Sequence, residues 1–311
     1  MSATTNTSPT STRMRHRQGF AALRSAARTS RGKVGLSITA AIVAIAVIGP
    51  FVAPYSSTSF ESIPFARPSA HFWLGTDTLG RDVLSRLLDG GWVLLLMALA
   101  ATSFGLVFGS AAGISAAYLR GRTDGLIMRS VDVILAFPSL VFALLLVSLV
   151  GPKLWLIVIA VGFSHAPQVA RVLRSSALDI SERDYVKSIE LQGVRPAKIM
   201  WSEIVPNLIS PLMVEAGLRL TYSIVIISGL SFLGFGQAPP APNWGYMINE
   251  NRIGLQNSPW GVIVPALLIA LLTIGVNTFT DAVARVAIGV ERRPAEAALI
   301  DEITVTTGGV S

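Results

Sequence analysis

The sequence carries few of the residue combinations that perform catalysis. It has no cysteine and three histidines, His16, His71 and His165, which are scattered along the chain. The sequence contains no GxxxxGK[ST] phosphate loop, no HExxH zinc motif and no GxSxG nucleophile elbow. Gly32-Lys33 lacks both the preceding glycine spacing and the following hydroxyl of a phosphate loop. We therefore expect a protein that is not an enzyme and that itself binds no metal or other cofactor.

Three titratable side chains lie within apolar stretches, where an ionisable residue is a candidate for function. Glu215 and Arg219 have (i, i+4) spacing, which places both on one face of a helix where they can pair. This pair either locks two helices together or lines a path across the membrane. His165 stands close to Pro167 and either satisfies backbone groups that the proline frees or belongs to the same path.

The composition is that of a membrane protein. The chain has 311 residues, of which 51% are hydrophobic and 14% are charged, and its mean hydropathy is +0.59. A soluble domain carries about a quarter charged residues. The net charge of +7 does not indicate a nucleic-acid partner, because the charges lie in the gaps between apolar runs and mostly in alternate gaps.

These apolar runs predict an all-α membrane protein with six transmembrane helices. The first run, Val34 to Pro54, has 21 residues without a charge, so it can cross the roughly 30 Å hydrocarbon layer and is too long for the apolar core of a cleaved signal peptide. Small residues in the second run predict close helix packing, and Pro138 predicts a kink in the third. The expected spans are about 34–54, 92–118, 128–150, 154–173, 208–235 and 261–288.

The two ends of the chain differ from this transmembrane domain, which we place at residues 34–290. Residues 1–33 are basic and rich in Ser and Thr, and residues 291–311 are polar, so both ends are expected to be disordered and cytoplasmic. With both termini inside, the cytoplasmic side holds 19 of the 25 Lys and Arg residues and the outer segments hold five. The positive-inside rule supports this topology, which places residues 181–207 in the cytoplasm.

The 181–207 segment predicts two short helices separated by a sharp break. Gly193 stands where a helix C-terminus needs left-handed dihedral angles, and Pro196 suits the first turn of the next helix. The segment is either a solvated loop or a pair of amphipathic helices on which a partner protein docks. The candidate residues for docking are Tyr185, Val186, Glu190, Leu191, Gly193, Arg195 and Pro196.

Two further patterns are best described by a resemblance. Residues 74–86, LGTDTLGRDVLSR, closely resemble the LGTDxxGRDxxSR signature of the C-type subunit of dipeptide and oligopeptide ABC-importer permeases. Residues 128–139, MRSVDVILAFPS, resemble the same branch. The 181–207 segment is similar to the cytoplasmic "EAA" loop of these permeases at Tyr185-Val186, Gly193 and Pro206-Asn207, although Lys187, Ser188 and Ile189 replace the Glu-Ala-Ala triplet itself.

The resemblance covers roughly residues 30–290 and implies the type I ABC importer permease fold in a bacterial inner or plasma membrane. It implies a heterodimer with a second permease, two cytoplasmic ATPase subunits that bind ATP and Mg, and an extracytoplasmic solute-binding protein. The helices at 184–203 would then act as a lever that the ATPases move. Membrane lipid surrounds the chain, and no nucleic acid takes part.

The implied cargo is a di- or oligopeptide. Nickel, glutathione or another small solute is the alternative, because related importers carry them. From the residues alone, a stand-alone secondary transporter remains a second possibility, and Glu215, Arg219 and the His165 region are its candidates.

Overall fold

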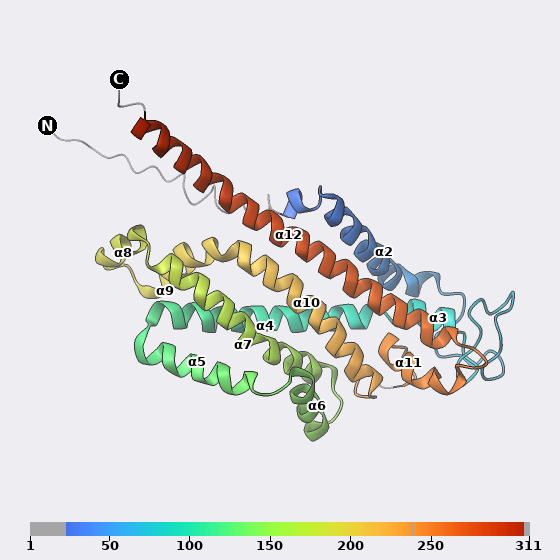
Figure 1. Cartoon of the computed structure of the whole chain (residues 1–311). Helices are drawn as coiled ribbons and strands as arrows, with labels where there is room; N and C mark the ends of the chain where they lie inside the picture. The colour runs from blue at the N-terminus through green and yellow to red at the C-terminus, as the bar shows by residue number, and fades with distance from the viewer. Residues whose placement is uncertain (1–22, 238, 308–311) are drawn as a thin grey trace.

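The computed structural model describes residues 23–237 and 239–307, and the regular elements in that part are helices (Figure 1). Long helices pack together along most of the molecule, and the shorter ones lie at its two ends and along one side (Figure 1). The long helices are α2 (Ser30–Val52), α4 (Trp92–Leu119), α7 (Leu154–Ser181), α10 (Ile209–Phe232) and α12 (Trp260–Thr307). The shorter ones are α3 (Val83–Asp89), α5 (Gly121–Leu135), α6 (Ser139–Val150), α8 (Asp184–Leu191), α9 (Pro196–Ile199) and α11 (Trp244–Asn251).

The all-helical membrane fold is confirmed. Five helical units of the described chain are long and apolar enough to cross a membrane, and the bent pair α5 and α6 makes a sixth if it is counted as one span. The expected first, second, fourth, fifth and sixth spans correspond to α2, α4, α7, α10 and α12. Most of their ends lie within a few residues of the expected bounds, while α7 and α12 extend further into the cytoplasm.

The third span differs from the single kinked helix expected over 128–150. Helices α5 and α6 meet at 83°, with Pro138 at the N-cap of α6. A proline has no N–H to donate to the preceding turn, and it disfavours the helical conformation of the residue before it. Helix α6 has 12 residues and is about 18 Å long, too short to cross the hydrocarbon layer by itself.

The ends of the described chain are more helical than the sequence suggested. Residues 1–22 and 308–311 lie outside the described residues, so the disorder expected there stays a prediction. Residues 23–33 are ordered, because Thr29 caps α2 by accepting from the Gly32 N–H at 3.0 Å, and Ala26 is buried in an apolar cluster with residues of α12. Helix α12 continues to Thr307, and its last part contains several Ala and Glu residues, which are good helix formers. The disorder expected for the tail stays a prediction.

Glycines on α4 allow α7 to pack against it at very short range. A Cβ atom added to Gly105 would lie 2.9 Å from the carbonyl oxygen of Gly162, and one added to Gly109 would lie 2.5 Å from that of Ala166. One turn further on, a Cβ atom added to Gly113 would lie 2.4 Å from the carbonyl oxygen of Ala170. The four-residue spacing places these glycines on one face of α4, as in other close membrane helix pairs. The interpretation of these small residues as packing residues is therefore confirmed.

Helix α11 closes one end of the bundle between α10 and α12 (Figure 1). Trp244 at its start is fully buried, and its Nε1 donates to the backbone oxygen of Leu87 at 2.7 Å. Since the chain enters α4 and leaves α2 at this end, α11 lies on the outer side of the membrane in the predicted topology. The segment between the fifth and sixth expected spans is therefore partly helical.

The α4–α7 packing generates a stability prediction. We expect Gly109→Val to lower the free energy of unfolding by about 1–3 kcal/mol, because the added side chain collides with backbone that cannot move away. Unfolding of the purified chain in detergent measures this difference. The matched control is Gly125→Ala on α5, where no heavy atom lies within 4 Å of the added Cβ and where stability should rise by about 0.5–1 kcal/mol. Equal stability of Gly109→Val and the original chain would contradict the packing argument.

Candidate functional site

The cytoplasmic loop at 181–207 has the predicted break between two helices. Helix α8 ends at Leu191, and Gly193 adopts a φ of +75° while its N–H donates to the oxygen of Glu190 at 2.9 Å. Arg195 is extended, as a residue before proline prefers, and Pro196 begins α9. The predicted roles of Gly193 and Pro196 in shaping this turn are confirmed.

An apolar cluster beneath the loop holds α8 and α9 against the inner ends of α4 and α7. Val186 is fully buried in it, which corrects its expected place on a docking surface. The apolar side of α8 faces the membrane helices, so Val186 is covered by this chain itself and positions α8. The buried members of this inner apolar cluster are Ile114, Ala117, Ala177, Ile180, Val186, Ile199, Ile204 and Leu208.

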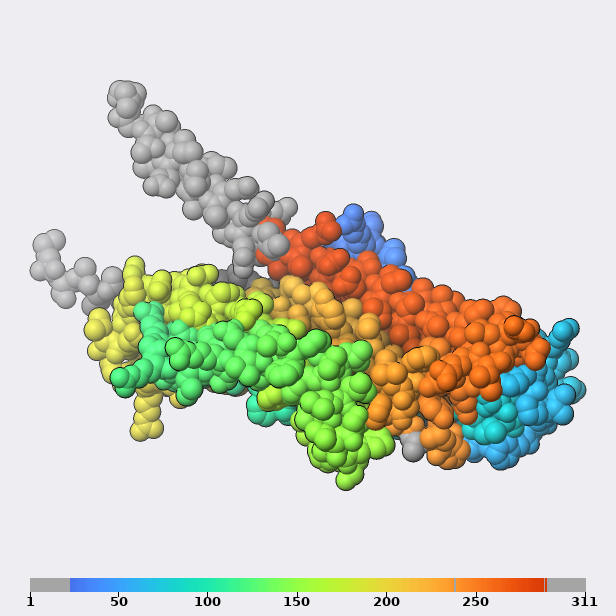
Figure 2. Space-filling view, turned by 60° about the horizontal axis from the view of Figure 1, so that its bottom comes forward, coloured from blue at the N-terminus to red at the C-terminus, as the bar shows by residue number. Residues whose placement is uncertain are grey.

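The outward side of the loop carries two large exposed apolar side chains. Leu191 is 90% exposed, and Trp201, just after α9, is 77% exposed. Both lie in the segment for which the sequence predicts a docking role, so both are candidate partner contacts. The loop protrudes from the left end of the molecule (Figure 2). Trp201 was not among the docking residues predicted from the sequence. Its indole in a polar cytoplasmic segment is the feature that could have indicated it.

The other predicted docking residues lie around these two side chains in different ways. Tyr185 is half-buried, and its hydroxyl accepts from Asn207 Nδ2 at 3.4 Å, which links the beginning of the loop to its end. The remaining predicted docking residues, all of them exposed, are Glu190, Gly193, Arg195 and Pro196.

The second half of the loop continues into α10 without leaving helical geometry. After α9 come a π-helical turn, η1 (Met200–Ile204), and a 3₁₀ turn, η2 (Val205–Leu208), and α10 begins at Ile209. Pro206 cannot donate a backbone hydrogen bond, so a change of helical type near it is expected. The loop and α10 therefore form one helical rod, defined here as residues 196–232.

Midway along this rod, α10 joins α7 through Arg219. Arg219 pairs with Glu215 at 3.1 Å, donates to the Gln168 side chain on α7 and lies 5.2 Å from the centre of the Tyr222 ring. Glu215 is 5% exposed and Arg219 is 9% exposed. The pairing expected from their spacing is present, and it is part of a contact between two helices.

His165 belongs to the same contact region. Its Nε2 lies 3.1 Å from the hydroxyl oxygen of Ser223 on α10, which lies 3.1 Å from that of Thr102 on α4. His165 is 1% exposed and Ser223 is fully buried. The three candidates from the sequence thus lie together between α4, α7 and α10. We call the set the α10 polar cluster, and it comprises Thr102, His165, Gln168, Glu215, Arg219 and Ser223.

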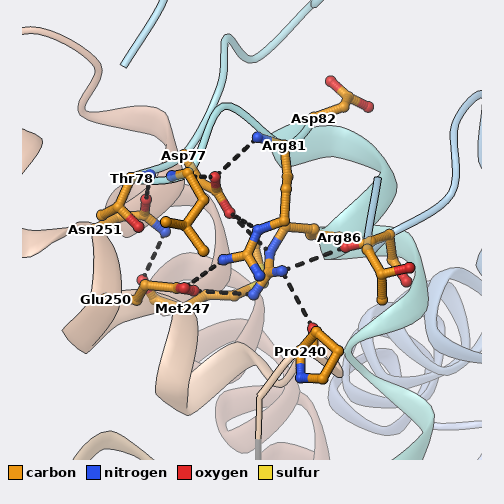
Figure 3. Close-up of polar contacts among 12 residues, drawn as sticks. Asp77, Thr78, Arg81, Asp82, Arg86, Pro240, Met247, Glu250 and Asn251 are labelled. Carbon is orange, nitrogen blue, oxygen red and sulfur yellow. Dashed lines mark hydrogen bonds and ion pairs between the residues drawn. The ribbon is translucent and has the colours of Figure 1, made fainter. Parts of the chain in front are cut away.

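At the opposite end, four charged residues form a buried network between the 55–91 segment and α11 (Figure 3). Asp77 Oδ2 lies 2.7 Å from Arg81 Nε and 3.2 Å from Arg86 Nε. Both arginines also pair with Glu250 of α11, Arg86 through Nη2 at 2.9 Å. The two positive and two negative side chains of this outer charge network balance each other. Asp77, Arg81 and Arg86 are each at most 1% exposed.

The network explains the residues of the 74–86 signature. Asp77 Oδ1 also accepts from the N–H groups of Leu79 and Arg81, at 2.8 and 2.9 Å. Gly80 has a φ of +76°, and a Cβ there would lie 1.9 Å from the Ser62 oxygen. Asp82 caps α3, accepting from the N–H and hydroxyl of Ser85 at 2.8 and 2.6 Å. The signature therefore encodes a folded outer segment.

Within residues 23–237 and 239–307, no group of three or more His, Asp or Glu residues is arranged to hold a metal ion.

Comparison with known proteins places this architecture in one family. The family described as "Binding-protein-dependent transport system inner membrane component" matches residues 105–287. The dipeptide transport system permease protein DppC of Alkalihalophilus pseudofirmus is 34% identical over 251 residues, 80% of this chain and 82% of the relative. The di/tripeptide transport system permease protein DppC of Pseudomonas aeruginosa is 37% identical over 79% of this chain and 84% of its own length. The glutathione transport system permease protein GsiD of Pectobacterium atrosepticum is 33% identical over 77% of this chain and 80% of its own length.

The outer charge network generates the second prediction. Glu250→Gln leaves two buried arginines with the single carboxylate of Asp77, and we expect it to lower the free energy of unfolding by about 3–5 kcal/mol. Thermal unfolding of the purified chain in detergent measures the loss. The matched control is Arg252→Gln, two residues further along the chain and exposed, which should change stability by less than about 0.5 kcal/mol. If both variants unfold alike, the network does not stabilise this end of the molecule.

Proposed function

This chain belongs to the family of binding-protein-dependent transport system inner membrane components, and we propose that it carries di- or oligopeptides through a path formed with a second permease subunit. As a member of that family it is a multi-pass inner-membrane permease of an ABC importer and is not itself catalytic. The family depends on binding proteins, so the stand-alone secondary transporter is no longer an alternative.

The peptide cargo is supported by the relatives. Two of those described above are named for dipeptide or di/tripeptide transport, and one for glutathione, which is itself a short peptide derivative. A small peptide carries both an amine and a carboxylate, and glutathione shares this character. Glutathione, nickel or another small solute remains the alternative cargo, carried by the same kind of machine.

The coupling role rests on one observation, the exposed Leu191 and Trp201 on a loop that is continuous with a transmembrane helix. A cytoplasmic ATPase subunit that covers these side chains would remove their apolar surface from water. Buried aromatic and aliphatic anchors provide much of the energy in protein interfaces. The exposed charges of Glu190 and Arg195 would set the register of the complex.

The helical rod transmits movement of the ATPase subunits to the transmembrane helices. Two ATPase subunits bind ATP and Mg and close, and each pulls on the loop of one permease. Because residues 196–232 form one rod, a displacement of α9 displaces α10 with it. The α10 polar cluster then transmits the force to α4 and α7, and the permease pair turns from inward-facing to outward-facing. The solute-binding protein releases its cargo at the outer end of the permease, beside the 55–91 segment and α11, which the outer charge network joins.

Trimming the exposed anchors tests this proposal. Leu191→Ser and Trp201→Ser should each weaken binding of the ATPase subunits by about 1–2 kcal/mol and lower dipeptide uptake, because each removes apolar contact area. Co-purification with the ATPase subunits and uptake of a labelled dipeptide, with glutathione and nickel as competitors, are the measurements. Ser188→Ala, an exposed change on α8, is the matched control and should leave both unchanged. Full ATPase recovery with both anchor variants would sink the docking role.

The turn between α8 and α9 provides a sharper test. We expect Gly193→Val to keep the chain in the membrane but to uncouple ATP hydrolysis from uptake, because a β-branched residue disfavours the φ of +75°. Gly193→Asn should retain coupling, since Asn tolerates left-handed dihedral angles. No heavy atom lies within 4 Å of the added Cβ, so the comparison isolates backbone conformation from crowding. The ratio of ATP hydrolysed to dipeptide transported is measured, and a normal ratio in Gly193→Val would refute the idea.

A further inference from the structure

The first described residues of the chain form an exposed basic surface where α2 begins. All four cations between residues 23 and 33 are exposed, and among the described side chains none of them forms an ion pair. Residues 1–33 contain seven Lys and Arg residues and no acidic residue. We define the basic patch as Arg24, Arg28, Arg31 and Lys33.

The basic patch is held in place by the fold. Ala26 is fully buried in an apolar cluster with Ala282 and Val283 of α12. The hydroxyl of Thr29 donates to the oxygen of Ala26 at 2.7 Å and accepts from the N–H of Gly32 at 3.0 Å. The four cations are therefore fixed at the junction of α2 with α12, where the two helices lie side by side (Figure 1).

The patch lies at the level of the lipid headgroups. The uncharged run of α2 starts at Val34, directly after Lys33, and is long enough to cross the hydrocarbon layer. Val34 is 54% exposed and Leu36 is 43% exposed, as expected for side chains that contact lipid tails. A phospholipid beside these residues would have its phosphate close to the four cations.

Helix stability and topology do not account for this arrangement. Arg31 and Lys33 stand in the first turn of α2, which contains no acidic residue, although the helix dipole disfavours cations at that end. The positive-inside rule requires cytoplasmic charges but does not require them to be folded against α12. On the neighbouring turn of α12 the exposed Asp281 and Arg285 have opposite charges, so the patch keeps its positive charge.

We propose that the basic patch binds the phosphate groups of anionic phospholipids in the cytoplasmic leaflet and anchors the junction of α2 and α12 there. Guanidinium groups donate pairs of hydrogen bonds to phosphate oxygens, and each cation near an anionic membrane surface raises the affinity about fivefold. The binding weakens with salt, because the patch is open to solvent. The anchored junction gives α10 a fixed neighbour against which to move.

The absence of cysteine allows a site-specific test in the assembled transporter. Ser25→Cys, an exposed position inside the patch, carries a fluorophore, and the complex is reconstituted in phosphatidylcholine nanodiscs. The quencher is phosphatidylglycerol or phosphatidylcholine spin-labelled near the carbonyl end of an acyl chain, so that each headgroup keeps its charge. We expect phosphatidylglycerol to quench at a much lower mole fraction, and high salt to remove the difference.

The variants decide whether the patch itself is responsible. Each cation is expected to raise the affinity for anionic lipid about fivefold. Arg28→Gln/Arg31→Gln, which removes two cations, should therefore reduce the preference for phosphatidylglycerol at least about tenfold. Arg28→Lys/Arg31→Lys, which keeps the charge, should retain most of it. The matched control is Arg122→Gln/Arg129→Gln, two exposed cations of α5, which should leave the preference unchanged. The double Gln variant still has 17 cytoplasmic cations against five outer ones, so its topology should persist. Protection of the unlabelled thiol introduced by Ser25→Cys from an impermeant reagent in intact cells, and its reaction once the membrane is opened, check this.

Three results would overturn the proposal. Equal quenching by the two lipids would show that the patch does not select anionic headgroups. Equal losses in the two Gln variants would show a general attraction of the cytoplasmic face for anionic lipid. Release of the ATPase subunits from Arg28→Gln/Arg31→Gln with unchanged quenching would show that the patch binds an acidic protein surface instead.

Discussion

The close packing of α4 against α7 is the contact on which the rest of the molecule depends. Hydrophobic driving force is weak between helices in lipid, so association relies on van der Waals contact at short range. Gly105, Gly109 and Gly113 provide it by letting the backbone of α7 approach α4. The pair then presents one composite surface, and both the cytoplasmic loop and α10 are seated on it.

Different parts of that surface contact different elements. At the cytoplasmic end, residues of α4 and α7 form the floor of the inner apolar cluster, on which α8 and α9 rest. In the middle, Thr102, His165 and Gln168 offer polar groups to α10. These polar groups give α10 defined partners on both α4 and α7. Beyond these polar contacts, α10 also packs into the apolar core of the bundle through Ile224, Ile227 and Leu230.

The outer end adds charge pairing to the apolar packing of α3 and α11. Asp77, Arg81, Arg86 and Glu250 are paired so that no buried charge lacks a counterion, which is the condition under which a buried network is tolerated. The network joins two segments far apart in the sequence and gives α11 a defined position.

The sequence by itself determined the features that depend on local chemistry or on composition. Long uncharged runs required transmembrane helices, because a backbone in lipid must satisfy its own hydrogen bonds. Gly193 and Pro196 determined the break in the loop, since their preferred dihedral angles are intrinsic. The spacing of Glu215 and Arg219 determined their pairing for the same reason, because it involves one helix only.

Tertiary structure decided which way each helix faces and what lies opposite. Val186 and Leu191 are both apolar residues of α8, yet the first is buried and the second is exposed, because the ends of α4 and α7 cover only one side of that helix. The meeting of Arg81 and Arg86 with Glu250 of α11 has the same origin. Such contacts join residues that are distant in the chain. A local sequence pattern cannot predict them, because the surface that each residue packs against forms only when the chain folds.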